Sequence, residues 1–543
     1  MRQEVFQIDE KKLEGLIQCV SKFPSKGSSD NGYIYINLSM VRLQTVWYLP
    51  KLIYALGMSN VTCNKIKVIM WRRNKLFEKL ISSMGMEQLC LEEMTRKNIF
   101  SAVIAFIYTV QLCVIKGTGR DLQKFRKDSI PIGMALYEDI IRTSKLSTIK
   151  STRNITCIKK VFHLLWMIFS LDKYLNKNTP KCAIIDDLAY HEAAVAALFY
   201  KKGAKVVNVS PASEELIDFD EKFRTIRRGE KANQKVRTMI NLGMAPDLSE
   251  VDNYFERLFQ GDAGKILDRG AFKGKKAYKR EEIIELYKLD PQKKVVVIMA
   301  HTFSDAVFNY GVLYFRDYYD WLEYTLKTVR AIKNVNWVLK PHPTRKAYHE
   351  DSDSIEKMYE KYKAENTRFL DDSISMESIK ELADVIVTIG GNAGGEVACF
   401  GVPSIIVGTP YYKGFGYTIE PKNKQQYEEV LRKIDCIKPL TKKQIHTAKL
   451  VYYYGKIYDD AELSFRDGFA KLLNELYKKM LDAIVLEYFE NDNMTKKYND
   501  IITEKATEYI NRNGIINCEY YMRGKKRGVE IKTCSNVLCG DNK

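Results

Sequence analysis

Three short segments of the sequence combine side chains that bind anions with glycines that leave the backbone open. They are AHTFSDA at 300–306, KPHPTRK at 340–346 and GGNAGGE at 390–396, and each follows an apolar, strand-like run. The carboxyl ends of parallel strands lie at one edge of a sheet, so we expect the three segments to meet there. Histidine, lysine and arginine, together with open backbone N–H groups at the start of a helix, favour a phosphate group.

The glycines suggest that another molecule comes close to the backbone, because glycine is otherwise costly in ordered structure. Glu396 follows them and is expected to bind the hydroxyls of a ribose, the alternative being that it stabilises the helix dipole. His342 lies between two prolines and is expected to stabilise negative charge on a departing nucleotide. The predicted nucleotide-binding residues are His301, Thr302, Lys340, His342, Pro343, Arg345, Gly390, Gly391, Asn392, Gly394, Gly395 and Glu396.

A second candidate site lies in the first half of the chain, in IIDDLAYHEAA at 184–194. One of its aspartates is expected to cap a helix, and the other to act as general base for an acceptor hydroxyl; capping alone is an open alternative. We therefore predict Asp186, Asp187 and His342 as catalytic residues. The polar residues of SIPIGMALYEDIIR at 129–142 have no role that their types and spacing define.

The metal signals are weak. DFD at 218–220 and DSD at 351–353 match the short DxD pattern that holds a divalent cation, but this pattern is common by chance and we discount both. The eleven cysteines include no CxxC pair, so free thiols in a reducing cytoplasm are expected. We predict neither a metal site nor a cofactor.

The composition is that of a soluble globular protein of two or three domains, with 543 residues, 45% hydrophobic and 28% charged. The net charge of +18 favours anionic partners, such as nucleotides, acidic sugars, nucleic acid or a membrane surface. A lysine-rich, solvated surface explains the charge equally well. The basic residues are dispersed and the aromatic residues form no stacking motif, so nucleic acid is not predicted as a partner.

The most apolar stretch, at 100–115, is shorter than the roughly 20 residues that span a bilayer and contains Gln111. We expect it to form a buried or interfacial helix. The first residues lack the apolar region of a signal peptide. These features predict a cytoplasmic protein with, at most, peripheral contact with the inner face of the plasma membrane.

Strand-like and helix-like segments alternate through the second half of the chain, which predicts a doubly wound parallel sheet and an α/β fold. The expected strands are at 293–301, 335–340, 367–370, 384–389 and 404–408. The first half repeats this pattern at 33–38, 65–71, 181–187 and 204–210. We predict Rossmann-like domains at 1–275, with a helical insertion at about 75–178, and at 276–435. Bracing helices at 436–490 and a basic extension at 491–543 follow.

The order AHTFSDA, DYYDWLEYTLK, NVNWVLKPHP and ADVIVTIGGNAGGEVACFGVPSIIVGTPYYKGFGYT resembles the bacterial capsule and surface-carbohydrate biosynthesis glycosyltransferases. These are GT-B proteins related to the transferases that use CMP-Kdo or CMP-sialic acid. The resemblance covers about 290–420, with weaker similarity at PIGMALYEDIIR and YINLSMVRLQTVWYLPKLI. It implies two Rossmann-like domains that face a cleft.

The resemblance also implies a metal-independent glycosyltransferase whose second domain holds a nucleotide-sugar donor, with His342 and Pro343 at its phosphate. The expected donor is a CMP-sugar, and the expected acceptor is a surface polysaccharide or its lipid-linked precursor. Some relatives pair the HP motif with an acidic-acidic-glycine motif, whereas this chain has Asp186, Asp187 and Leu188. The alternatives are a UDP-sugar 2-epimerase, a CDP-polyol phosphotransferase and, remotely, a basic binding protein without catalytic activity. The donor sugar, acceptor, stereochemistry, general base and oligomeric state are left open.

Overall fold

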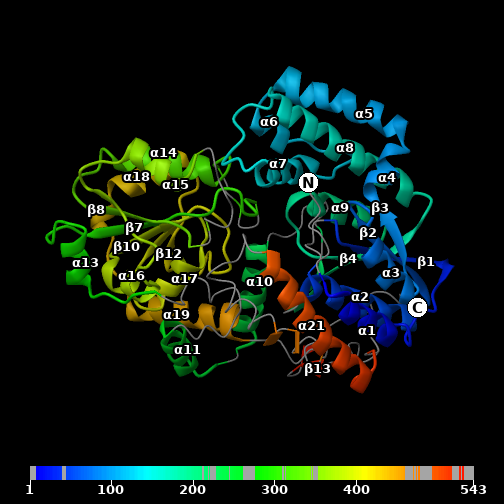
Figure 1. The fold of residues 1–543 in the computed structure, drawn as a ribbon. Helices are drawn as coiled ribbons and strands as arrows, with labels where there is room; N and C mark the ends of the chain where they lie inside the picture. The colour runs from blue at the N-terminus through cyan, green and yellow to red at the C-terminus, as the bar shows by residue number, and fades with distance from the viewer. Residues whose placement is uncertain are drawn as a thin grey trace. The chain divides into compact units, whose positions relative to one another are not determined.

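In a computed structural model the chain divides into two compact units (Figure 1). Unit 1 comprises residues 1–140, 150–225 and 460–543, and unit 2 comprises residues 141–149 and 226–459. The structure describes residues 8–39, 44–210, 213–217, 219, 228–243, 245–260, 275–308, 311, 314–343, 345, 353–458, 469, 472–473, 475–476, 492–515, 525–526 and 529–530.

Unit 1 contains a six-stranded sheet in the order β3-β2-β1-β4-β5-β6. Its strands are β1 (Ser28–Asn37), β2 (Asn64–Met70), β3 (Glu87–Cys90), β4 (Pro180–Ile185), β5 (Lys205–Ser210) and β6 (Ser213–Ile217). All neighbours pair in parallel except β6, which is antiparallel to β5. Continuous apolar runs in β2 and β4 are buried, as is typical of a sheet that helices cover on both faces.

The segment predicted as a helical insertion is mostly helical but also contributes a strand. Its elements are α3 (Lys75–Ser83), β3, α4 (Leu91–Arg96), α5 (Ile99–Thr109), the π-helix η1 (Val110–Lys116), α6 (Gly119–Gln123), α7 (Ile132–Thr143) and α8 (Ile155–Leu175). The sequence prediction missed β3 because its four residues, EQLC, carry no strand pattern of their own. They become a strand by pairing with β2. The remaining helices beside this sheet are α1 (Glu10–Val20), α2 (Thr45–Thr62) and α9 (Tyr190–Lys201).

Unit 2 contains a second six-stranded sheet, entirely parallel, in the order β12-β11-β10-β7-β8-β9. Its strands are β7 (Val295–Met299), β8 (Asn336–Lys340), β9 (Thr367–Phe369), β10 (Val385–Thr388), β11 (Ser404–Ile406) and β12 (Thr418–Ile419). Its helices include α13 (Arg280–Leu286), α14 (Tyr318–Val329), α15 (Ile355–Tyr362), α16 (Met376–Leu382), α17 (Asn392–Ala398), α18 (Lys424–Arg432) and the 3-10 helix η3 (Ile434–Cys436). The predicted doubly wound α/β fold is therefore confirmed.

Both sheets have the same internal order, in which the chain winds outward through three strands and then returns to the centre to wind the other way. This is the Rossmann arrangement, and the winding reverses between β1 and β4 in unit 1 and between β7 and β10 in unit 2. Ligands of such sheets bind at the carboxyl ends of the strands beside the reversal. These two points therefore locate the functional site in each unit.

The boundary between the units precedes the domain boundary that we predict at 275. Helices α10 (Arg228–Asn241) and α11 (Ser249–Phe259) join α19 (Lys442–Tyr452) and the π-helix η4 (Tyr453–Ile457) in an aromatic core of unit 2. The rings of Phe255 and Tyr452 pack in this core with their centroids 4.7 Å apart. The sequence of a polar helix does not show which sheet the helix packs against. The assignment of α10 and α11 to unit 2 therefore depends on the tertiary contacts.

The end of the chain is divided between the two units. The π-helix η4 belongs to unit 2, whereas α21 (Asp492–Asn513) packs against α1 in unit 1. Lys12 forms an ion pair of 2.9 Å with Glu504, and the Asp9 amide donates to Asp500 at 2.6 Å. Much of the predicted bracing region at 436–490 lies outside the described residues. Within the predicted basic extension at 491–543, the structure describes residues 492–515, which include α21, and the short strands β13 (Lys525–Lys526) and β14 (Val529–Glu530).

Candidate functional site

In unit 2 the strands beside the winding reversal bring two of the predicted segments together. His301 follows β7, and its Nε2 atom lies 3.3 Å from Oγ1 of Thr388, the last residue of β10. The same Thr388 hydroxyl accepts the Gly391 amide at 3.2 Å, which fixes the loop that leads into α17. His301 also packs on the Tyr318 ring at 4.7 Å. The structure thus places the histidine and the glycine loop at one edge of the sheet.

The two histidines of this edge are both held in the neutral form. Burial and, to a smaller extent, the neighbouring His342 lower the pKa of His301 to about 3. Burial also lowers the pKa of His342; the Asp305 carboxylate raises it, and Arg345 adds to the lowering. A phosphate that entered beside these rings would favour the protonated form of each. The pair is therefore suited to receiving negative charge.

Thr302 adds a buried polar atom to the same strand end. Its side chain is 2% exposed, and its hydroxyl has no hydrogen-bond partner in the structure. A buried hydroxyl without a partner is costly, typically by about 1–3 kcal/mol. Unsatisfied groups of this kind often belong to sites that a ligand completes.

The histidine pKa predicts an acid-sensitive unit 2. Between the ordinary pKa of 6.5 and about 3, the unfolded chain binds a proton that folded His301 does not. The free energy of unfolding should therefore fall as the pH drops below 6.5, by at most about 1.4 kcal/mol per pH unit for this group. Urea unfolding between pH 7 and pH 5 should show a shallower slope for His301→Gln. Equal slopes for the variant and the natural chain would contradict this assignment.

The two predicted phosphate-binding cations of the KPHPTRK segment are engaged within the protein. The Lys340 ammonium donates to the carbonyls of Asp371, Ile374 and Asp372 at 2.8, 2.9 and 3.3 Å, and it is 7% exposed. Arg345 pairs with Glu356 at 2.6 Å and with Asp372 at 2.5 Å. Both side chains therefore hold the loop at 371–374, and these contacts give no support to a phosphate role.

Two of the glycines are explained by aromatic packing. A Cβ atom on Gly394 would lie 2.5 Å from the Tyr412 hydroxyl, and one on Gly395 would lie 2.9 Å from the Tyr412 ring. The Tyr412 hydroxyl donates to the Gly391 carbonyl at 2.6 Å, just before α17 begins. The close approach that we predict from sequence is therefore made by a tyrosine of the protein itself. Gly391 differs, because the atoms nearest to a Cβ there would be the Thr388 hydroxyl at 3.2 Å and the His301 ring at 3.6 Å.

This packing can be tested with a double-mutant cycle. Gly394→Ala should destabilise unit 2 by about 1–3 kcal/mol because the new methyl group overlaps the Tyr412 hydroxyl. Tyr412→Phe should cost about 1 kcal/mol through its lost hydrogen bond. Urea unfolding of the double variant should give less than the sum of the two losses, since the phenylalanine makes room for the methyl group. A strictly additive pair would show that the glycine serves something other than the tyrosine.

Glu396 is the fifth residue of α17, just beyond the first turn, in which the effect of the helix dipole is concentrated. The dipole alternative therefore does not account for it. Its side chain is 8% exposed, and its carboxylate helps burial to raise the pKa of the Tyr411 hydroxyl. Contact with a ribose stays a prediction. Gly390 is buried, whereas Pro343 and Asn392 are partly exposed beside the same strand ends.

In unit 1 the strands beside the winding reversal carry a buried polar cluster. Lys51 of α2 is fully buried, and its ammonium lies 2.5 Å from Asp186, which follows β4 and is 24% exposed. The same ammonium donates to the Trp47 carbonyl at 2.8 Å. Lys51 therefore holds the Asp186 carboxylate in place at the sheet edge while leaving part of it accessible.

Two further carboxylates flank Asp186. Glu192 of α9 is buried and accepts the Asp187 amide at 3.0 Å, while its other oxygen has no hydrogen-bond partner in the structure. Burial and the charge of Asp186 raise the pKa of Glu192 well above the ordinary value, which favours the neutral acid. Asp187 accepts the Leu188 amide at 2.7 Å. The predicted aspartate cap is wrong, because Ala189 occupies the N-cap of α9, and the amide of Tyr190, the first residue of the helix, donates to Glu138 at 3.0 Å.

A buried chain of three side chains lies beside this cluster, and the sequence prediction missed it. His191 Nδ1 lies 2.6 Å from Asp139 of α7, and its Nε2 lies 3.0 Å from the Ser39 hydroxyl just past β1. His191 and Asp139 are almost completely buried, so they are placed to hold the loop rather than to touch a substrate. One indication of this cluster is present in the sequence, the acidic pair Glu138 and Asp139 in the 129–142 segment. The sequence could not show that Asp139 contacts His191, which lies 52 residues further along the chain.

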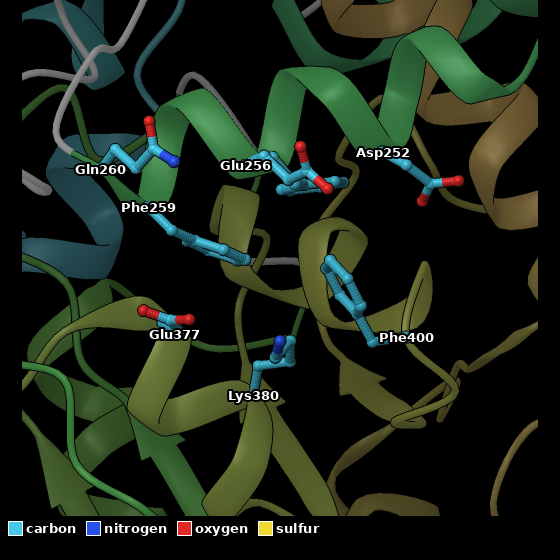
Figure 2. A pocket seen from close by; sticks show the side chains of 8 residues that line it. Asp252, Glu256, Phe259, Gln260, Glu377, Lys380 and Phe400 are labelled. Carbon is cyan, nitrogen blue, oxygen red and sulfur yellow. The ribbon is translucent and has the colours of Figure 1, made fainter.

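A separate open pocket of about 480 Å³ lies between α11, α16 and the end of α17. Figure 2 shows Lys380 beside Phe259 and Phe400, and its ammonium lies 5.2 and 4.8 Å from their ring centres. None of the predicted site residues lines this pocket.

Among the described residues, no group of three or more histidine, cysteine or acidic side chains is arranged to hold a metal ion. Both DxD segments include residues outside the described part: 218 and 220 in the first, and 351 and 352 in the second.

Comparison with known structures gives only a distant likeness. The Thermosulfurimonas dismutans KpsC β-Kdo 2,7 transferase is 15% identical, with a TM-score of 0.28, over 52% of this chain and 79% of that one. The KpsC β-Kdo 2,4 transferase of the same organism is 14% identical, with a TM-score of 0.30, over 50% of this chain and 79% of that one. A glycosyltransferase from Rickettsia africae is 10% identical, with a TM-score of 0.27, over 84% and 99%. No curated protein matches the sequence.

The family comparison is more informative because it concerns the segment that forms the strand-end site of unit 2. Residues 262–458, which include His301, His342 and the glycine loop, match the model described as capsule polysaccharide biosynthesis protein. The rest of the chain lies outside this match.

Proposed function

We propose that this chain is a glycosyltransferase that moves a sugar from a nucleotide-sugar donor to a capsule or other surface polysaccharide, or to its lipid-linked precursor. The observation that carries the proposal is that the family match at 262–458 contains the strand-end site of unit 2. At that site two neutral histidines and a buried threonine hydroxyl without a partner follow β7 and β8, at the end of the strands where Rossmann-like sheets bind ligands.

The donor site that we propose uses His301, Thr302 and His342. Neutral imidazoles can donate hydrogen bonds to a phosphate, and they gain a proton more readily as negative charge accumulates nearby. His342 thereby stabilises the departing nucleotide. In keeping with the sequence resemblance, we propose a CMP-sugar of the Kdo or sialic type as donor and a reaction that needs neither metal nor cofactor.

The acceptor hydroxyl is activated, in this proposal, by Asp186 of unit 1. Two carboxylates lie together there in different environments: Asp186 is paired with the buried Lys51 ammonium, whereas burial raises the pKa of Glu192 well above its ordinary value. Neighbouring carboxyls in different environments are the usual way in which a site separates a base from an acid. Asp186 is also the more exposed of the two, so an acceptor can reach it. We place the reaction in the cytoplasm, where nucleotide sugars are made.

The first test is a thermal-shift panel of CMP, CDP, UDP, GDP and ADP. A ligand at 100 times its dissociation constant should stabilise the folded state by about 2.7 kcal/mol. We expect CMP to raise the melting temperature of the natural chain and of His446→Ala, an exposed histidine of unit 2, but not of His342→Ala.

Other outcomes of the panel separate the alternatives. Stabilisation by UDP alone would favour a UDP-sugar transferase or an epimerase, and stabilisation by CDP would favour a polyol-phosphate transferase. Absence of any shift would contradict the donor site. An equal CMP shift in His342→Ala would remove His342 from the nucleotide contact.

A further inference from the structure

The helix formed by α5 and η1 has its large apolar side chains on the outside of unit 1. Seven of them are between 52% and 74% exposed: Ile99, Phe100, Val103, Phe106, Ile107, Val114 and Ile115. This segment, Ile99–Lys116, is the one described helix that is long and apolar enough to cross a membrane. The expectation of a buried helix is therefore wrong, while that of an interfacial helix is still open.

The buried side of α5 is made of small residues, whereas η1 buries Leu112 and Cys113. Ser101, Ala105 and Thr109 are spaced four residues apart, so they form one stripe, and all three are buried. They allow the helix to lie close against α8, alongside which it runs (Figure 1). The usual pattern, in which large apolar groups face the protein, is reversed. Contiguous exposed apolar surface of this extent marks an interaction site.

Charge favours a membrane as the occupant of this face. No acidic residue occurs between Glu93 and Asp121, whereas Lys97 and Lys116 are exposed at the two ends of the helix. Lys173 of α8 is also exposed and places its ammonium 5.4 Å from the Phe100 ring centre. An apolar face bordered by lysines is the composition of helices that lie in the headgroup region of anionic bilayers.

The contacts of the helix favour an orientation parallel to the membrane plane rather than across it. Trp166 of α8 donates to the Asn98 carbonyl at 2.9 Å, and the Thr152 amide donates to the Gly117 carbonyl at 3.1 Å. Both ends are thus tied to α8 or to the turn that precedes it. Since α8 carries Lys159 and Asp172, a crossing would draw these charges into the bilayer.

We propose that α5 and η1 form a membrane-docking surface that lies in the interface of an anionic bilayer. The seven apolar side chains enter the boundary between headgroups and acyl chains, and the lysines contact the lipid phosphates. The proposal does not depend on the transferase activity, but it would hold unit 1 at the surface where a lipid-linked acceptor is found.

The test is co-sedimentation of the full chain with vesicles of phosphatidylcholine that contain 30% phosphatidylserine. Phe106→Ser combined with Ile107→Ser should reduce binding at least tenfold. Lys116→Gln combined with Lys173→Gln should reduce it by about fivefold for each lysine removed. The matched control is Leu286→Ser, at a 58% exposed leucine of unit 2, which should bind as the natural chain does. All the replaced side chains are exposed, so the melting temperatures should not change.

Three results would overturn the proposal. The first is equal binding by the natural chain and the Phe106/Ile107 variant. The second is equal binding to anionic and to purely phosphatidylcholine vesicles. The third is a lipid-free dimer that ignores vesicles and dissociates in the Phe106/Ile107 variant, which would make the face an interface between copies. Nucleotide stabilisation should be the same in every variant, so failure here is distinguishable from failure of the proposed function.

Discussion

Replacing Asp186 by asparagine is expected to lower kcat by about 10²–10⁴-fold, the usual contribution of a positioned general base. Asparagine preserves the shape of the side chain and can still accept a hydrogen bond from Lys51, so the loss should be chemical rather than structural. The readout is nucleotide release from the donor selected by the thermal-shift panel. The KM for the donor should stay the same, because Asp186 belongs to unit 1.

The neighbouring aspartate provides the matched control for this experiment. The Asp187 carboxylate accepts the Leu188 amide and so serves the loop. Asp187→Asn should therefore lose less than tenfold in kcat. A larger loss for Asp187→Asn than for Asp186→Asn would transfer the role of base to Asp187. Unchanged turnover in both variants would remove the acidic pair from the mechanism.

Replacing Lys340 by methionine is expected to lower the free energy of unfolding by about 2–4 kcal/mol. Three loop carbonyls lose their donor, each at about 1–3 kcal/mol, and relief from burying a charge offsets part of this loss. Burial lowers the pKa of Lys340 from 10.5 to about 8, so burying this charge is costly. Urea unfolding followed by tryptophan fluorescence measures the difference.

The Lys340 experiment also separates a structural role from a phosphate contact. Lys333→Met, at an exposed lysine just before the same strand, should change stability by less than about 0.5 kcal/mol. At a temperature where Lys340→Met is still folded, its nucleotide affinity should equal that of the natural chain. Loss of affinity without loss of stability would restore the phosphate role that the sequence suggested.

Local sequence was sufficient to determine the strands and the fold class. The run VVVIM is apolar along its whole length and NWVLK has an apolar centre, as expected of strands buried on both faces, and alternation with helices indicated a parallel sheet. The local sequence also predicted that His301 and Gly391 lie at one sheet edge, since both follow such strands. The exceptions were short. Strands β3, β6 and β12 have four, five and two residues, were not predicted, and are strands because a neighbour pairs with them.

Tertiary structure decided which of the predicted site residues are available to a ligand. Sequence could not show that three carbonyls at 371–374 surround Lys340, or that Tyr412 fills the space beside Gly394. It could not pair Lys51 with Asp186 across 135 residues. The apolar segment at 99–116 was evident from composition. Which of its faces points outward was decided by the small residues that pack on α8. Residue types and spacing determine the local elements, whereas burial and partners depend on chain segments that are remote in sequence.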